Sequence, residues 1–321
     1  MHVGLPALLL FTLVTPAHAQ RWAVDDPGQG PVALAAGAAQ AHELSGIAWL
    51  GGDRYVAVSD NDGRLARLRI GLDPRSGRIA QAAVLDVVTL TGSTDLEGVA
   101  VTADGSRVVV ADEIEPTLRE YAVAGGPPLR QARVPAVFAQ RRRNLGFEAL
   151  ARDAEGALWT ANEEALRPDG PTSSAAAGTR VRLQRFDADL RPSGQWIYQT
   201  DAIAGAPVLA DRGTGLSDLV ALPDGRLLAL ERSLGSDGLR IRLFELDLAG
   251  ASEVSRLAAL DGVPLTPVRK HLLWERTGVR DNYEGATLGP PLADGSRSLL
   301  LVADDGPRLD QSLYALRLRA R

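Results

Sequence analysis

The chain has 321 residues, of which 45% are hydrophobic, and a formal net charge of -5. This length is enough to bury one large core, so we expect a single domain, and the acidic balance argues against DNA or RNA as a partner. Cysteine is absent, which excludes disulfides, thiolate catalysis and sulfur-ligated zinc. Only His42 and His271 follow residue 20, so a histidine-rich metal site is excluded as well.

The N-terminus has the pattern of a secretory signal peptide. Leu5–Val14 form a short apolar run, and Ala17-His18-Ala19 is the small-x-small motif that signal peptidase accepts. We predict a signal peptide over residues 1–19, cleaved between Ala19 and Gln20, and a periplasmic or secreted domain over residues 20–321. The alternative is an uncleaved core strand. No later segment approaches the roughly 18 apolar residues that span a bilayer, so we predict no membrane span.

Five copies of one unit follow in chain order. Each unit opens with a short apolar strand: Leu44–Ala48, Leu96–Ala100, Phe147–Ala151, Leu216–Val220 and Tyr283–Thr287. A second strand ends in polar or charged residues: Val56–Asp60, Val109–Glu113, Trp159–Glu163, Leu228–Arg232 and Leu301–Asp305. The third strand alternates apolar and polar residues: Ala66–Ile70, Leu118–Val123, Val181–Phe186, Ile241–Leu246 and Leu313–Leu318. This periodicity is typical of half-buried strands, and glycine-containing turns separate the first two strands of each unit.

The repeat predicts an all-β fold, a single β-propeller of about five four-stranded blades. A fourth strand follows in the first four units, for example at Ala83–Val88 and Gln195–Tyr198. The fifth unit runs out of chain, and we expect a strand from Arg21–Ala36 to close the ring at the missing outer position. A degenerate sixth blade at Pro264–Arg276 is the alternative count.

Acidic residues recur at corresponding places in these units. Glutamates open three first strands, and acids close the second strands. The set comprises Glu97, Glu148, Glu284, Asp60, Asp112, Glu163, Glu231 and Asp304. In a propeller the start of the first strand and the end of the second lie on one face, so we expect the carboxylates to converge at one channel mouth. The alternative for each acid is a turn cap or a structural pair with an arginine.

Several motifs resemble the phytase-like family described as "esterase-like activity of phytase", which occurs in exported bacterial proteins. The resemblance runs from Leu44 to Leu318. Its most specific stretches are Asn144–Leu150, Asn162–Leu166, Gly215–Leu219, Leu230–Ser233, Asn282–Ala286 and Ala303–Asp305. It implies a propeller whose recurrent Glu and Asp residues hydrolyse a phosphoester or a related ester.

We therefore expect metal-assisted hydrolysis of a small anionic ester by a monomer. The expected ligands of a Ca²⁺ or Mg²⁺ ion are oxygen atoms from Glu97, Glu148, Glu284, Asp60 and Asp304. The candidates for a catalytic general base are Asp112, Glu163 and Glu231. The candidates for substrate binding are Arg143, Arg232 and Asn162, although each arginine has a structural salt bridge as its alternative.

Two other functions are compatible with the sequence. One is a non-catalytic propeller that binds a ligand or partner on its channel face. The other is a sugar-lactone hydrolase with a similar acid-rich site. A serine esterase is disfavoured, because no Gly-x-Ser-x-Gly motif is present.

Overall fold

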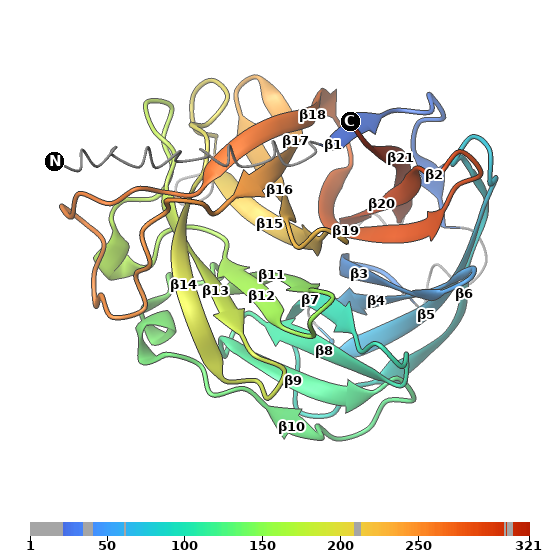
Figure 1. The fold of residues 1–321 in the computed structure, drawn as a ribbon, viewed down its shortest axis with the longest axis horizontal. Helices are drawn as coiled ribbons and strands as arrows, with labels where there is room; N and C mark the ends of the chain where they lie inside the picture. Colours follow the sequence, from blue (N-terminus) through green and yellow to red (C-terminus); the bar gives the residue numbers. More distant parts are fainter. Residues whose placement is uncertain (1–21, 35–40, 61, 209–212, 305, 307–310) are drawn as a thin grey trace, which may run out of the picture.

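A computed structural model describes residues 22–34, 41–60, 62–208, 213–304, 306 and 311–321. The fold is all-β, with five antiparallel sheets arranged in a ring (Figure 1). The first blade contains β3 (Leu44–Gly51), β4 (Arg54–Ser59), β5 (Arg64–Leu72) and β6 (Ile79–Thr89). The second contains β7 (Leu96–Val101), β8 (Arg107–Asp112), β9 (Thr117–Ala122) and β10 (Arg130–Gln131). The predicted propeller is therefore confirmed.

The other three blades repeat this order. The third contains β11 (Phe147–Arg152), β12 (Leu158–Asn162), β13 (Arg180–Phe186) and β14 (Pro192–Gln199). The fourth contains β15 (Thr214–Ala221), β16 (Leu227–Gly235), β17 (Gly238–Asp247) and β18 (Arg269–Val279). The fifth contains β19 (Asn282–Pro291), β20 (Arg297–Asp304) and β21 (Ser312–Ala320). The segment considered for a sixth blade contributes instead to β18, the outer strand of the fourth blade, so the count is five.

The N-terminal segment completes the fifth blade, as predicted. β1 (Trp22–Asp25) pairs antiparallel with β21, with Trp22 opposite Ala320 and Asp25 opposite Arg317. β2 (Val32–Ala33) pairs with the other end of the same strand. Figure 1 shows the blue β1 beside the dark red β21. The predicted signal peptide lies outside the described residues. Among those described, no helix is long and apolar enough to cross a bilayer.

The blades are held together by apolar side chains packed between neighbouring sheets. Between the first two blades, for example, Val56 and Leu65 pack in one buried cluster with Val110 and Tyr121. The first strand of each sheet lies nearest the centre of the ring, and β6, β10, β14 and β18 lie at its periphery (Figure 1). Among the described residues, the short 3₁₀ helices η2 (Ala136–Gln140) and η3 (Arg167–Asp169) lie in loops outside the sheets.

Each central strand contains a β-bulge near its start. In the third blade Phe147 pairs with Asn162 and Ala149 with Ala161, so Glu148 has no partner in the ladder. In the second blade Leu96 pairs with Asp112 but Val99 pairs with Val110, so one residue is again extra. The same irregularity occurs at the start of the other three central strands. A bulge redirects one side chain and increases the local twist. The residues at these bulges are Ser45, Glu97, Glu148, Ser217 and Glu284.

The central strands approach one another closely just after the bulges. A Cβ atom added to Gly98 would lie 2.6 Å from the carbonyl oxygen of Glu148, and one added to Gly285 would lie 2.3 Å from that of Ser45. Such contacts are far shorter than a real Cβ permits, so only glycine fits there. The close approach of the neighbouring backbone therefore requires glycine at this position in the first, second and fifth blades.

Asp218 occupies the equivalent position in β15 and is buried. Its carboxylate accepts hydrogen bonds from the backbone N–H of Leu150 at 3.1 Å and of Ala286 at 2.7 Å, on the two neighbouring central strands. The N–H of Leu219 donates a third bond at 2.8 Å. Burial raises the pKa of Asp218 to about 8 despite these three donors. Asp218 thus connects three of the five central strands.

Candidate active site

Two sets of side chains face one mouth of the channel. The first set consists of the bulge residues defined above. The second set takes one residue from each blade, the one directly after the second-strand ladder partner of the residue that precedes the bulge: Asp60, Glu113, Glu163, Arg232 and Asp304. Electrostatic repulsion between members of both sets shows that they converge, since Asp60 is affected by Asp304 and Glu284, and Glu148 by Glu97 and Glu163. We call the acids of these sets, together with Asp95, the acid ring.

Glu113 lies at the centre of the tightest part of the acid ring. Carboxylate oxygens of Asp95, Glu97 and Glu113 lie within 4.8 Å of one another, and so do those of Glu113, Glu148 and Glu163. All five side chains are buried, and Glu113 is only 1% exposed. Two groups of three carboxylates that share one member are therefore withdrawn from solvent at this mouth.

Burial and mutual repulsion favour protonated forms of these acids. The pKa values of Glu97 and Glu148 lie well above the ordinary range, first because the carboxyls are desolvated and then because neighbouring acids repel their charge. For the same two reasons the pKa of Asp60 is raised to about 8. Burial likewise raises the pKa of Glu113 to about 7, although the Gly146 N–H donates a hydrogen bond to it at 3.1 Å. The acid ring is thus poised to take up protons or a cation near neutral pH.

Arg232 is the cation placed among these acids by the fourth blade. Its guanidinium donates a hydrogen bond to Glu163 and lies 3.4 Å from a carboxylate oxygen of Glu284. The side chain of Glu163 reaches Arg232 across Gly215, where a Cβ would collide with it at 2.4 Å. Glu284 is further held by the Asn282 amide at 2.9 Å, and its pKa is about 7, raised by burial and lowered by Arg232. Arg232 therefore offsets part of the negative charge on one side of the mouth.

Two of the predicted catalytic acids lie apart from this arrangement. Asp112 pairs in the ladder with Leu96, and its carboxylate accepts a 2.8 Å hydrogen bond from Arg119. Glu231 pairs with Leu216 and accepts bonds from Tyr198 at 2.9 Å and from Lys270 at 2.8 Å. Successive residues of a strand face opposite sides, so Glu113 and Arg232, one residue further on, face the mouth instead.

The predicted substrate-binding residues are in three different environments. Arg232 belongs to the mouth. Asn162 is fully buried, where its amide donates to the carbonyl oxygen of Glu164 and its side-chain oxygen accepts a 3.1 Å bond from the Arg182 N–H. Arg143 is exposed on a loop and lines a separate pocket. The five predicted metal ligands, by contrast, all belong to the acid ring.

Asp95 and Glu113 are members of the acid ring that the sequence patterns did not single out. Asp95 stands directly before the opening Leu96, and its carbonyl oxygen accepts a 3.0 Å bond from the Glu113 N–H. The sequence does contain a signal for Glu113, because it directly follows Asp112 just as Glu163 directly follows Asn162. Aligning the second strands on their ladder partners identifies Glu113 as the equivalent of Glu163.

The opposite end of the central strands has a different character. A small cavity of about 170 Å³ lies there, and its lining residues are mostly apolar, among them Ile47, Val99, Leu150 and Leu219, together with the charged Arg152. The charged groups are therefore concentrated at one mouth of the channel.

Comparison with known proteins identified one family and several distant structures. The sequence profile of the family "Phytase-like: Esterase-like activity of phytase" matches residues 40–306. Comparison with curated proteins found no match. Solved structures with a similar trace include the PQQ-bound aldose sugar dehydrogenase of Streptomyces coelicolor, at 13% identity and a TM-score of 0.44, covering 93% of this chain and 99% of that one.

Two further similar structures come from other bacteria. The periplasmic gluconolactonase PpgL of Pseudomonas aeruginosa has 16% identity and a TM-score of 0.38, with 86% of this chain and 87% of that chain covered. An endo-arabinase of Bacteroides thetaiotaomicron has 12% identity and a TM-score of 0.44, with 84% and 90% covered. Identities at this level carry no information about the substrate of the present chain.

Proposed function

Because this chain belongs to the phytase-like family with esterase-like activity, we propose that it hydrolyses a phosphoester or a related ester at the acid ring, assisted by a bound divalent cation. The observation that carries the proposal is the pair of carboxylate groups sharing Glu113, each with its oxygens within 4.8 Å of one another. Acids gathered in this way at low solvent exposure require protons, arginine or a cation to relieve their repulsion. Arg232 supplies only one positive charge.

The donor set fits a hard cation. All candidate ligands at the mouth are oxygen atoms, which Ca²⁺ and Mg²⁺ prefer. Two bulge residues support this reading independently, because the hydroxyls of Ser45 and Ser217 are buried and have no hydrogen-bond partner within the part of the chain that the structure describes. These side chains are 2% and 5% exposed, and a buried hydroxyl without a partner is costly unless a ligand satisfies it.

We assign the cation to Glu113 together with Asp95, Glu97 and Glu148 from its two groups. Glu97 and Glu148, predicted as ligands from the sequence, belong to these groups, and Glu284, Asp60 and Asp304 complete the shell of negative charge around them. A bound Ca²⁺ or Mg²⁺ would polarise an ester oxygen and favour ionisation of a water molecule.

The remaining roles fall to residues at the same mouth. Among the three candidate bases, Glu163 alone faces the acid ring, and we assign it to accept a proton from the attacking water. Arg232 lies beside it, and its Nε–H has no hydrogen-bond partner among the described residues, which leaves a donor for an ester or phosphoryl oxygen. Asp112 is bound by Arg119 and Glu231 by Lys270, each within its own blade. We therefore assign these two acids a positioning role.

Cation binding by the purified protein tests this proposal. Calorimetric titration of Ca²⁺ and Mg²⁺ into the wild type should show binding, and Glu148→Gln should weaken it by about tenfold or more, because a charged ligand is lost. Glu155→Gln is the matched control, since Glu155 is 85% exposed and pairs with Arg185 outside the acid ring. If the wild type binds neither cation, the metal-assisted mechanism is refuted and a ligand-binding propeller is the better account.

Hydrolysis assays then identify the substrate class. Wild type and Glu148→Gln are compared on phosphoesters, carboxylic esters and sugar lactones in the presence of the cation that binds. We expect phosphoester turnover that is lost in Glu148→Gln and retained in Glu155→Gln. Turnover of lactones alone would reassign the same acid ring to lactone hydrolysis.

A further inference from the structure

A second pocket lies on the same face of the propeller as the acid ring. It is a groove of about 660 Å³ between the loop that follows β8 and the segment that leads into β11. Its walls continue the chain segments that carry the acid ring: Glu115 is two residues after Glu113, Arg143 is five residues before Glu148, and Arg167 is four residues after Glu163. The groove and the acid ring are therefore built on the same ends of the second and third blades.

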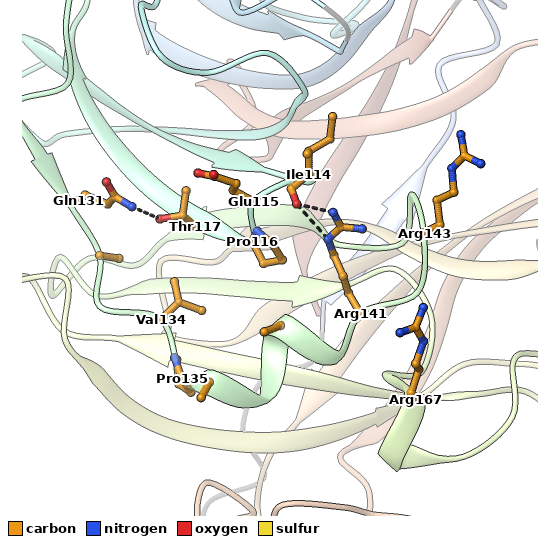
Figure 2. Close-up of a pocket in the computed structure, with 13 residues that line it drawn as sticks. Ile114, Glu115, Pro116, Thr117, Gln131, Val134, Pro135, Arg141, Arg143 and Arg167 are labelled. Carbon is orange, nitrogen blue, oxygen red and sulfur yellow. Dashed lines mark hydrogen bonds between the residues drawn. The ribbon is translucent and has the colours of Figure 1, made fainter.

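Positive charge is concentrated at one side of the groove. Figure 2 shows Arg141, Arg143 and Arg167 along that side. The guanidinium of Arg141 is fixed by the backbone carbonyl oxygen of Ile114. The side chains of Arg143 and Arg167 are exposed and form no hydrogen bond or ion pair with another described residue. Guanidinium groups with free donors in a concave site are suited to an oxyanion.

The rest of the groove is mainly apolar. Pro116, Val134 and Pro135 form part of its lining (Figure 2). Glu115, the acid that lines it, is engaged with Arg119 at 2.9 Å. A ligand that matches both parts carries an anionic group at one end and an apolar body at the other.

We propose that this groove binds an organic oxyanion, with its phosphate or carboxylate group on Arg143 and Arg167 and its apolar body against Val134 and Pro135. The inference rests on the proposed function and narrows it. The substrate would carry, besides the ester bond at the acid ring, an anionic group that the groove holds apart from that bond. Positive charge beside the strongly acidic mouth would also orient such a molecule, with its anionic end directed away from the carboxylates.

Binding of phenyl phosphate in a chelator tests the groove separately from the acid ring. Without a divalent cation the acid ring repels the phosphate, so calorimetry or ligand-observed NMR reports on the groove. We expect the wild type to bind phenyl phosphate more tightly than inorganic phosphate. The double variant Arg143→Gln/Arg167→Gln should bind it at least about tenfold more weakly, because two charge-assisted contacts are lost. Val134→Asn should weaken the binding of phenyl phosphate and leave that of inorganic phosphate unchanged.

Two controls separate the possible outcomes. Arg256→Gln removes an exposed arginine outside the groove and should not change affinity. Glu148→Gln alters the acid ring and should leave phenyl phosphate binding in chelator intact, so failure of the metal proposal and failure of the groove proposal are distinguishable. Equal binding by wild type and the double variant, or no binding by the wild type, would overturn the assignment of the groove. Loss of binding in Glu148→Gln equal to that in the double variant would do so too.

Discussion

Glu113 offers the sharpest test of the acid ring, because it belongs to both close carboxylate groups. Glu113→Gln keeps the shape of the side chain and an oxygen that can accept the hydrogen bond from the Gly146 N–H, but removes one negative charge. In the wild type the pKa of Glu113 is about 7 against an ordinary value of 4.5. At about 1.4 kcal/mol for each tenfold change in proton affinity, this difference corresponds to about 3 kcal/mol.

Proton linkage determines whether the charge of Glu113 stabilises or destabilises the fold as pH changes. A carboxyl whose pKa is raised in the folded state holds its proton longer there than in the unfolded chain, so the folded state loses stability as pH rises from about 4.5 to about 7. Without a metal, Glu113→Gln should therefore match the wild type near pH 4.5. At pH 8 it should be more stable by up to about 3 kcal/mol, or about 5 °C in melting temperature for a chain of this length.

Thermal and urea unfolding at pH 4.5 and pH 8, with and without Ca²⁺, measure these effects. A cation at about one hundred times its dissociation constant should stabilise the wild type at pH 8 by about 2.7 kcal/mol, and Glu113→Gln by clearly less. Glu115→Gln, two residues along the same loop, controls for loss of surface charge. The reasoning is refuted if Glu113→Gln lowers stability equally at both pH values, since the folded state would then not disfavour the ionised form of Glu113.

Three further variants test other parts of the structure. Gly98→Ala should lower the melting temperature by about 5 °C or more because its Cβ meets a neighbouring backbone, whereas Gly225→Asn, at an open turn with φ of +84°, should be tolerated in the same thermal scan. Asp218→Ala leaves three backbone donors without their acceptor, so urea unfolding should show a loss of about 3 kcal/mol or more; a loss below about 1 kcal/mol would contradict its role as a connector. Asp112→Asn should weaken the contact with Arg119 and lower stability by about 1–3 kcal/mol, with kcat within about threefold of wild type; a fall in kcat like that of Glu148→Gln would return Asp112 to the chemistry.

Much of the architecture could be predicted from the sequence because the five units repeat in phase. The alternation of apolar and polar residues in segments such as Val181–Phe186 predicts the strands. The fifth unit lacks an outer strand, and this predicts that residues after 21 close the ring. The acids at the bulges were also predictable, since Glu97, Glu148 and Glu284 occupy the same place in their motifs. Repetition is a strong signal because every copy must satisfy the same packing.

The details of the acid ring depend on features that the pattern does not encode. A shift of one residue on a strand moves a side chain to the other face, and nothing in the apolar run ending at Asp112 says which of two consecutive acids faces the mouth. The ladder pairing decides in favour of Glu113. The groove at Arg143 and Arg167 is formed by loops from different blades, which no local sequence signal brings together.

The seam between β1 and β21 has a mechanical consequence. Trp22, at the start of the first described strand, lies opposite Ala320, near the end of the last. Tension that separates the two ends of the polypeptide therefore loads this antiparallel pair from one end and breaks its hydrogen bonds in succession, as in opening a zipper. The bonds of strands pulled along their length would instead share the load. Under force the ring should open first at this seam, and the four blades made of consecutive strands should yield later.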